Sequence, residues 1–286
     1  MQNAFTVDVE DYFQVSAFEK NISRDSWNDY PHHVVENTAR ILDLLAEKQV
    51  IGTFFILGWV AERYPDLVRR IADAGHELAS HSYWHRLVYE LTPESFREDL
   101  RRSKRAIEDA AGVSVTSYRA PSFSITQKSI WSLDVLAEEG FTCDSSIFPI
   151  VHDRYGIPGA KTEIHKIETK SGSIWEFPPS IRKFVGVNLP VSGGGYFRIY
   201  PYPFTANSFH RINKKLQRPF MFYIHPWEID PDQMRMDFAS RSTRFRHYTN
   251  LKTTHRKLSR LLSDFSFTTM GSVIQQASAE QDSPCP

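Results

Sequence analysis

The chain has 286 residues, with 34 Lys and Arg, 34 Asp and Glu, and a formal net charge of zero. Hydrophobic residues at 41% and charged residues at 24% exclude a mainly disordered chain. The charge balance excludes the overall basic excess of a nucleic-acid-binding protein.

Cysteine content and apolar runs bear on the compartment. Cys143 and Cys285 are far apart in the sequence, which gives no disulfide framework and fits a reducing compartment. The N-terminus lacks the basic start and long apolar stretch of a signal peptide. The longest largely apolar run, 50–61, is shorter than the roughly 20 residues that span a bilayer. We therefore expect a soluble, cytoplasmic protein without a transmembrane segment.

Strand-like and helix-like segments alternate through the first half of the chain. In chain order, the predicted elements are strand 4–9, helix 34–48, strand 53–57, helix 61–74, strand 76–80, helix 92–111, strand 115–118, helix 126–139 and strand 141–143. This alternation predicts parallel strands joined by crossover helices, in an α/β sheet or barrel.

The pattern changes after residue 145, where prolines and glycines become frequent. We predict an insertion over about 145–203, with short strands at 164–169 and 173–177, that shapes one side of a cleft. Helix 204–218, strand 220–224, helix 251–265 and strand 266–270 follow. We expect one domain over 1–274 and a disordered tail over 275–286.

Ionisable residues stand just past the ends of four predicted strands. They are Asp8, His81, Arg119 and Asp144. In parallel α/β folds the carboxyl ends of the strands form the edge where functional sites assemble. The sequence therefore predicts that these side chains meet.

The pair His81 and His85 is the most informative motif. Two imidazoles and one carboxylate make a three-ligand metal site that leaves a position for water. The acidic cluster after the first strand supplies candidates: Glu10 as ligand, Asp11 as the rival ligand, and Asp8 as a free base. Asp8 and Glu10 point the same way if the strand continues, whereas Asp11 points oppositely or begins a turn.

Other residues suit proton transfer and charge stabilisation. Arg119 near a catalytic carboxylate would fix its rotamer and keep it ionised, and the amide of Ser122 after Pro121 would serve as an oxyanion donor. His225, at the end of a core strand, is placed as a general acid whose tautomer is fixed by a carboxylate such as Asp144.

Aromatic and basic residues suggest further contacts. Tyr83, Trp84 and Trp227 lie close in sequence to the candidate ligands and acid, and flat apolar rings suit sugars. The basic residues of the C-terminal region favour a solvated helix face; the alternative is peripheral docking on anionic lipid or a lipid-linked pyrophosphate at the inner face of the membrane. These basic residues are Arg241, Arg244, Arg246, Lys252, Arg256, Lys257 and Arg260.

Five ordered segments over about 5–270 resemble the polysaccharide deacetylases of carbohydrate esterase family 4, which share the NodB homology domain. They are Thr6-Val7-Asp8-Val9-Glu10-Asp11, His81-Ser82-Tyr83-Trp84-His85, Arg119-Ala120-Pro121-Ser122, Phe141-Thr142-Cys143-Asp144-Ser145 and Tyr223-Ile224-His225-Pro226-Trp227. More narrowly, three segments look like the subfamily of bacterial exopolysaccharide clusters of the exosortase (PEP-CTERM) type. They are Val7-Asp8-Val9-Glu10-Asp11-Tyr12-Phe13, Gly193-Gly194-Gly195-Tyr196-Phe197-Arg198 and His225-Pro226-Trp227-Glu228.

The resemblance implies a distorted (β/α) barrel of about seven strands and a divalent ion, Zn²⁺ or similar. It also implies that Asp8 is the base, that His81 and His85 are ligands, and that His225 is the acid, supported by Asp144. Arg119 would orient the base. One departure is that Val9 separates Asp8 from Glu10 where the common motif has adjacent aspartates, which leaves Glu10 and Asp11 as alternative ligands.

The hypothesis from the sequence is amide hydrolysis of an N-acetylated amino sugar in an exopolysaccharide or its lipid-linked precursor. The first alternative is an allantoinase-like amide hydrolase acting on a small non-carbohydrate substrate, because the separated Asp-x-Glu also resembles the motif of allantoinase-type members of the same superfamily. The second is a non-catalytic sugar-binding protein on a retired fold, which predicts loss of a ligand or proton-transfer residue.

Overall fold

A nine-stranded sheet forms the centre of the protein in the computed structural model, which describes residues 1–152 and 154–282. The strand order is β10-β1-β2-β3-β4-β5-β7-β6, and β11 also pairs with β1. Every pairing is parallel except the antiparallel pairing of β6 with β7. The predicted α/β fold built on parallel strands is therefore confirmed. The strands are β1 (Asn3–Val9), β2 (Thr53–Ile56), β3 (Glu77–Ser80), β4 (Ser117–Tyr118), β5 (Cys143–Asp144), β6 (His165–Thr169), β7 (Gly172–Glu176), β10 (Met221–Ile224) and β11 (Phe267–Thr268).

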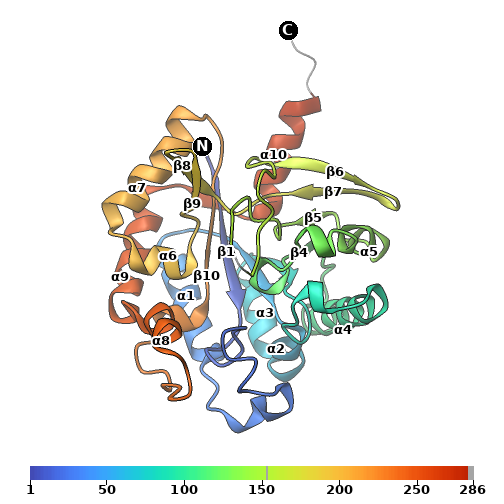
Figure 1. The fold of residues 1–286 in the computed structure, drawn as a ribbon, viewed down its shortest axis with the longest axis vertical. Coiled ribbons are helices and arrows are strands. Elements are labelled where there is room, and N and C mark those ends of the chain that lie inside the picture. Colours follow the sequence, from blue (N-terminus) through green and yellow to red (C-terminus); the bar gives the residue numbers. More distant parts are fainter. Residues whose placement is uncertain (153, 283–286) are drawn as a thin grey trace.

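Helices flank this sheet (Figure 1). They are α1 (Val34–Glu47), α2 (Gly58–Arg63), α3 (Pro65–Asp73), α4 (Pro93–Ala111), α5 (Ser132–Glu138), α6 (Gly194–Ile199), α7 (Tyr202–His210), α8 (Arg241–Tyr248), α9 (Leu251–Asp264) and α10 (Met270–Asp282). Among the described residues, no helix has the length and apolar character needed to cross a bilayer.

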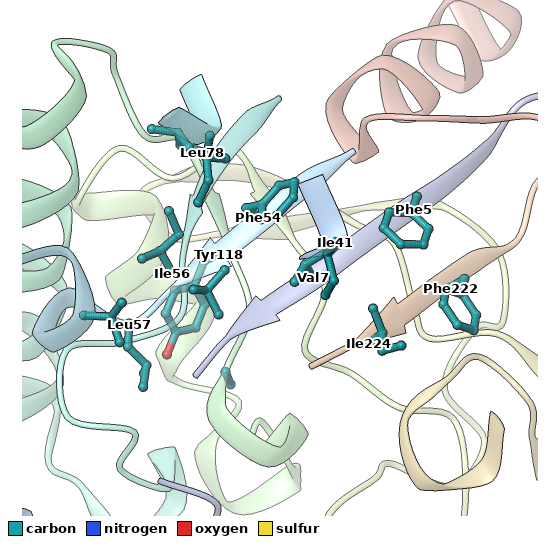
Figure 2. Close-up of a cluster of buried hydrophobic side chains, with 14 of the residues drawn as sticks. Phe5, Val7, Ile41, Phe54, Ile56, Leu57, Leu78, Tyr118, Phe222 and Ile224 are labelled. Atoms are coloured by element: carbon teal, nitrogen blue, oxygen red, sulfur yellow. The ribbon is translucent and has the colours of Figure 1, made fainter. Parts of the chain in front are cut away.

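The core lies where β1 and its neighbours pack against the helices. All seven residues of β1 are buried, as expected for a parallel strand covered on both faces. Figure 2 shows Val7 of β1 beside Ile41 of α1, with Ile224 on the neighbouring strand β10. Strand β1 is thus held centrally, and the residues that follow it have little freedom to move.

Two expectations about helical segments differ from the structure. The helix expected over 61–74 is two helices, because Pro65 has no amide hydrogen and starts α3 instead. The tail expected to be disordered from 275 is helical as far as Asp282, and Val273 and Ile274 are buried in α10. Residues 283–286 lie outside the described part.

The segment expected as an insertion, 145–203, contributes partly to the main sheet. Strand β7 pairs in parallel with β5, and β6 extends that edge. Strands β8 (Ile181–Phe184) and β9 (Val187–Pro190) form a separate two-stranded hairpin. One sheet therefore combines strands from both halves of the chain.

Candidate metal centre

The ends of β1, β3, β4 and β10 place the candidate residues at one edge of the sheet. Val7 of β1 pairs with Ile224 of β10, and Ser80 of β3 pairs with Tyr118 of β4. Because parallel strands end on the same side, residues after these pairs emerge together. Four strand ends at this edge thus carry the candidate residues, which are the acidic cluster, His81, Arg119 and His225.

Glu10, His81 and His85 form a compact group of potential ligands. Each offers one ligand atom, and these atoms all lie within 4.8 Å of one another. All three residues are buried, with Nε2 of His85 2.8 Å from Oε2 of Glu10. The two imidazoles and one carboxylate are the donors that a hydrolytic metal site uses.

The surroundings of Glu10 and His81 orient them as ligands. Nδ1 of His81 lies 2.8 Å from the carbonyl oxygen of Arg119; a proton on Nδ1 donated there leaves Nε2 with its lone pair for a metal. Trp227 Nε1 donates to Oε1 of Glu10 at 3.2 Å. Oε2 of Glu10 is buried and lies next to Nε2 of His85, so that two potential ligand atoms stand side by side. The residues present therefore fit a divalent metal ion.

The ionisation states of the ligands agree with this fit. Burial would raise the pKa of Glu10, but the opposing effect of His85, aided by His225 and His81, lowers it to about 2. Burial lowers the pKa of His81 to about 4. At neutral pH Glu10 is thus an anion and His81 is neutral, which are the forms that bind metals.

Asp11, the alternative ligand, has another place. Its Oδ2 accepts the backbone amides of His33 at 2.7 Å and Val34 at 3.0 Å, at the N-terminus of α1, and its Oδ1 accepts the amide of Tyr12. Carboxylates suit this position because the first amides of a helix lack partners within it. Both oxygens of Asp11 are thus used in hydrogen bonds away from the histidines, which argues against Asp11 as a ligand, and Glu10 as the ligand stays a prediction.

Asp8 lies beside the ligand group but is held by Arg119. Nη1 of Arg119 donates to Oδ1 of Asp8 at 2.6 Å and to Oγ1 of Thr6 at 2.9 Å. The guanidinium is fully buried and lies over the ring of Phe55. Its planar fork fixes the rotamer of Asp8 and balances the charge.

His225 completes the group from β10. Its Nε2 lies 3.8 Å from Oδ2 of Asp8 and 3.7 Å from Oε1 of Glu10. Its side chain is 18% exposed, compared with 3% for Asp8 and 2% for Glu10. A molecule that approaches from solvent thus has access to His225 in preference to either buried carboxylate.

The carboxylate that supports His225 is Glu228, and the expectation of Asp144 in this place is wrong. Glu228 Oε2 lies 3.1 Å from Nδ1 of His225, within the turn that forms the 3-10 helix Pro226–Ile229. Nε of Arg198 donates to Oε1 of Glu228 at 2.7 Å. Although burial lowers the pKa of His225, Glu228, with Glu10 and Asp8, raises it to about 9. Neither Glu228 nor Arg198 was assigned a role from sequence; the i, i+3 spacing of His225 and Glu228 was the available signal.

Asp144 supports the turn that carries Arg119. Its Oδ1 accepts the hydroxyl of Ser146 at 2.6 Å, and Oγ of Ser146 accepts the amide of Ala120 at 2.8 Å. Glu176, its pairing partner on β7, is fully buried. Burial and the neighbouring Asp144 raise the pKa of Glu176 well above its usual range. Asp144 is therefore a positioning residue rather than a partner of the acid.

Ser122 and Tyr83, two further residues predicted at the site, have hydrogen-bond partners within the protein. Ser122 has a left-handed φ of 51° after Pro121, and its hydroxyl lies 2.7 Å from that of Ser16; its amide as oxyanion donor stays a prediction. The Tyr83 hydroxyl donates to Glu62 of α2 at 2.5 Å.

The aromatic residues expected to contact sugar have packing partners within the protein, and their contact with a sugar stays a prediction. Tyr83 is buried against α2 and α4, and Trp84 packs on Trp27 and Tyr83. Trp227 stacks between the rings of His225 and His247. Of the three, Trp227 is placed at the ligand group, as a donor to Glu10.

Two family profiles match the chain. The polysaccharide deacetylase family matches residues 25–142, and a domain of unknown function (DUF3473) matches residues 145–275. The first match includes the His81–His85 motif and Arg119, whereas the acidic cluster precedes it and His225 falls in the second.

Curated relatives match part of the chain. A peptidoglycan-N-acetylglucosamine deacetylase of Bacillus cereus is 28% identical over 123 residues, which are 39% of this chain and 45% of the relative. A chitooligosaccharide deacetylase of Rhizobium leguminosarum bv. trifolii is 34% identical over 100 residues, 35% of this chain and 44% of the relative. The chain thus covers less than half the length of these relatives.

Solved structures share the fold over nearly the whole chain. A structure from Mycobacterium smegmatis assigned to the polysaccharide deacetylases superimposes with a TM-score of 0.63 at 22% identity, over 99% of this chain and 92% of the other. A CE4 family pseudoenzyme from Bacillus anthracis gives 0.50 at 14% identity, over 96% and 65%. Because the fold also occurs in a pseudoenzyme, activity must be argued from residues. Residues 25–142 of this chain thus match the polysaccharide deacetylase family, and the chain as a whole shares the fold of a solved structure assigned to that family.

Proposed function

We propose that this protein is a metal-dependent hydrolase that removes N-acetyl groups from an amino sugar. The observation that carries the proposal is the convergence of Glu10, His81 and His85 beside Asp8 and His225. A non-catalytic protein has no need to keep ligands, base and acid together, and each of these five residues is in place.

Glu10, His81 and His85 would hold the ion, which we propose to be Zn²⁺. A bound divalent metal lowers the pKa of a coordinated water toward ~7 and polarises a carbonyl oxygen. The chain supplies an anionic carboxylate, Glu10, and a neutral imidazole, His81, for this purpose. Trp227 and the carbonyl oxygen of Arg119 keep these two ligands oriented.

Asp8 is proposed as the general base. Arg119 holds Oδ1 of Asp8, so Oδ2 is the oxygen that faces His225 and the ligand group. A base must stand within hydrogen-bond reach of the proton it takes, in a fixed geometry. The buried contacts of Arg119 with Asp8 and Thr6 provide that fixed geometry.

His225 is proposed as the general acid that protonates the departing amine. Glu228 faces its Nδ1, so the proton on Nε2 points toward the Asp8 and Glu10 carboxylates and the reacting centre. Breakage of the C–N bond requires this proton, because an amide anion is a poor leaving group. The Ser122 amide is proposed to stabilise the oxyanion.

The proposed substrate is an N-acetylated amino sugar within an exopolysaccharide or its lipid-linked precursor. Relatives named as deacetylases of chitooligosaccharide and of peptidoglycan N-acetylglucosamine support the acetylated amino sugar. The exopolysaccharide assignment rests on the likeness of the His225-Pro226-Trp227-Glu228 and Gly193–Arg198 segments to the exosortase-type subfamily. A cytoplasmic location at the inner membrane face follows from the lipid-linked form of this proposal.

The test is acetate release by metal-loaded protein from a panel of N-acetylated oligosaccharides, with a cyclic ureide as the non-carbohydrate comparison. We expect acetate from at least one amino-sugar oligomer, loss of release after chelation, and recovery when Zn²⁺ is added back. Ureide hydrolysis without acetate release would contradict the proposal, as would release that chelation does not change.

A further inference from the structure

The tip of the β8–β9 hairpin exposes three large apolar side chains in sequence. Phe184 pairs with Val187, so that Val185 and Gly186 form a two-residue turn. Phe184 is 54% exposed, Val185 87% and Val187 58%. Exposed apolar side chains are common singly, but a contiguous set at a protruding turn marks an interaction site.

The backbone at this turn indicates that Val185 is not there for the sake of the fold. Its φ is 45°, and that of Gly186 is 77°. Two consecutive positive φ values define the turn in which Asn-Gly is strongly preferred, whereas a β-branched residue with positive φ is an outlier. Asparagine would fit this turn better than valine. The chain thus retains an apolar side chain at a position where it costs stability, which points to a functional use.

Basic residues lie on strand β8 of the hairpin and line a hollow beside it. A hollow of about 340 Å³ beside the hairpin is lined by Arg182, Lys183, Arg211 and Arg218, and Lys214 and Lys215 follow on the same segment. Arg182 of β8 bonds the α7 residues Asn207 and Ser208, which agrees with the position of the hairpin beside α7 (Figure 1).

The charge of this hollow is strongly one-sided. Glu163 is the acidic residue among those that line it, and its carboxylate is paired with Arg218 at 3.0 Å. Leu216, 49% exposed, adds a further apolar side chain to the lining. Exposed apolar side chains next to basic side chains are the combination that binds an anionic lipid surface.

We propose that the β8–β9 hairpin docks the protein on a bilayer that contains anionic phospholipid. Phe184, Val185 and Val187 enter the boundary between headgroups and acyl chains, and the basic residues of the hairpin and the neighbouring 211–215 segment contact lipid phosphates. Either signal alone gives weak, reversible binding, and stable association requires both. This inference goes beyond the proposed deacetylation and does not depend on it.

The C-terminal basic region provides a comparison within the same chain. Lys257 donates to the carbonyl oxygens of Phe197 and Tyr200, and Arg260 pairs with Asp264 at 3.6 Å, so both serve the fold. On α8, Phe245 is 60% exposed between Arg244 and Arg246. Phe245 therefore supplies a matched control, an exposed aromatic residue flanked by arginines outside the hairpin.

The experiment is vesicle sedimentation of the full chain, with phosphatidylcholine alone and with added phosphatidylglycerol, at low and high salt. We expect the wild type to bind the anionic vesicles at low salt and to dissociate at high salt, because exposed charges are then screened. Val185→Asn should raise the melting temperature by relieving the turn, yet weaken vesicle binding. The double change Phe184→Ser and Val187→Ser should weaken binding about tenfold or more, and Phe245→Ser should leave it unchanged.

Three results would overturn the proposal. The first is that the wild type does not bind anionic vesicles. The second is that Val185→Asn and the double variant bind as strongly as the wild type, and the third is that Phe245→Ser loses binding. Sedimentation velocity measures the oligomeric state as well. If the wild type is a dimer and Phe184→Ser is a monomer, the hairpin serves self-association instead. Acetate release from a soluble oligomer is unaffected by these hairpin variants, so a failure of the proposed catalysis remains distinguishable from a failure of docking.

Discussion

Nδ1 of His225 lies 3.1 Å from Oε2 of Glu228, while its other ring nitrogen faces the carboxylates of Asp8 and Glu10 at 3.8 and 3.7 Å. The imidazole therefore lies between the Glu228 carboxylate on one side and the carboxylates of Asp8 and Glu10 on the other. Arg198 holds the supporting carboxylate from behind at 2.7 Å. This arrangement explains how one ring can stay protonated and aimed at a leaving group.

Replacing Glu228 tests this relationship. Glu228→Gln removes the charge that faces Nδ1, so we expect kcat to fall by about 10²-fold or more, within the range that general acid catalysis supplies. The alkaline limb of the pH–rate profile should also shift to lower pH, because Glu228 raises the pKa of His225 in the wild type. A pH–rate profile of the metal-loaded enzyme checks both effects. If Asp144→Asn shifts the profile in this way and Glu228→Gln does not, Asp144 is the partner after all.

Asp8→Asn tests the base. The amide keeps the shape of the side chain but cannot take a proton, so acetate release should fall by about 10²- to 10⁴-fold while the metal stays bound. Metal content and initial rates measured on the same preparation check this. Asp43→Asn, at an exposed ion pair with Arg70, is the matched control and should retain full activity. Near-normal release by Asp8→Asn would show that another group removes the proton.

The two acidic neighbours Glu10 and Asp11 should respond oppositely to substitution. Glu10→Gln removes an anionic ligand, so metal affinity should fall by about 100-fold or more, since even loss of an outer partner costs 10- to 100-fold. Asp11→Ala should keep the metal but leave the amides of His33 and Val34 without their acceptor, which weakens the start of α1 at a cost of about 0.5–2 kcal/mol. Metal content after dialysis and thermal unfolding separate the two. The reverse pattern would return Asp11 to the metal.

The buried pair Asp144 and Glu176 predicts a pH dependence of stability. The pKa of Glu176 is raised in the folded protein above its ordinary value of 4.5. Its contribution to stability is therefore fully present below pH 4.5 and is lost as the pH rises toward the folded pKa. Glu176→Gln should remove that loss, giving a flatter curve of melting temperature against pH than the wild type, measured without metal.

Glu138→Gln, at a partly exposed salt bridge with Arg97, is the control for this experiment. Its curve should run parallel to the wild type, since a partly exposed pair contributes little. Parallel curves for Glu176→Gln and the wild type would mean that Glu176 carries no extra proton in the folded state.

The sequence was sufficient to predict the elements that bring the site together. Hydrophobic periodicity located β1, β3 and β10, and parallel strands place their following residues at one edge. The sequence also separated Glu10 from Asp11, on the condition that the strand continued past Asp8. The structure ends β1 at Val9, and the two carboxylates lie in different environments because Asp11 accepts amides at the start of α1.

The sequence could not determine which side chains become hydrogen-bond or packing partners, because these depend on the path of loops in three dimensions. Asp144 and Glu228 both follow strands near the site, and only the turn after His225 brings Glu228 to its ring. The position of Tyr83 depended in the same way on the path of the loop between His81 and His85, in which Ser82 and His85 both have positive φ. Local propensity does not predict such conformations, which functional sites maintain at a cost.

X-ray absorption spectroscopy of the zinc-loaded protein detects the metal ligands themselves. The proposed centre should give nitrogen and oxygen ligands at about 2.0–2.1 Å, with scattering from two imidazoles. His81→Ala should remove one of these imidazoles and Glu10→Gln should remove neither. A site without imidazole scattering, a sulfur ligand, or a spectrum unchanged by His81→Ala would contradict the metal centre formed by Glu10, His81 and His85.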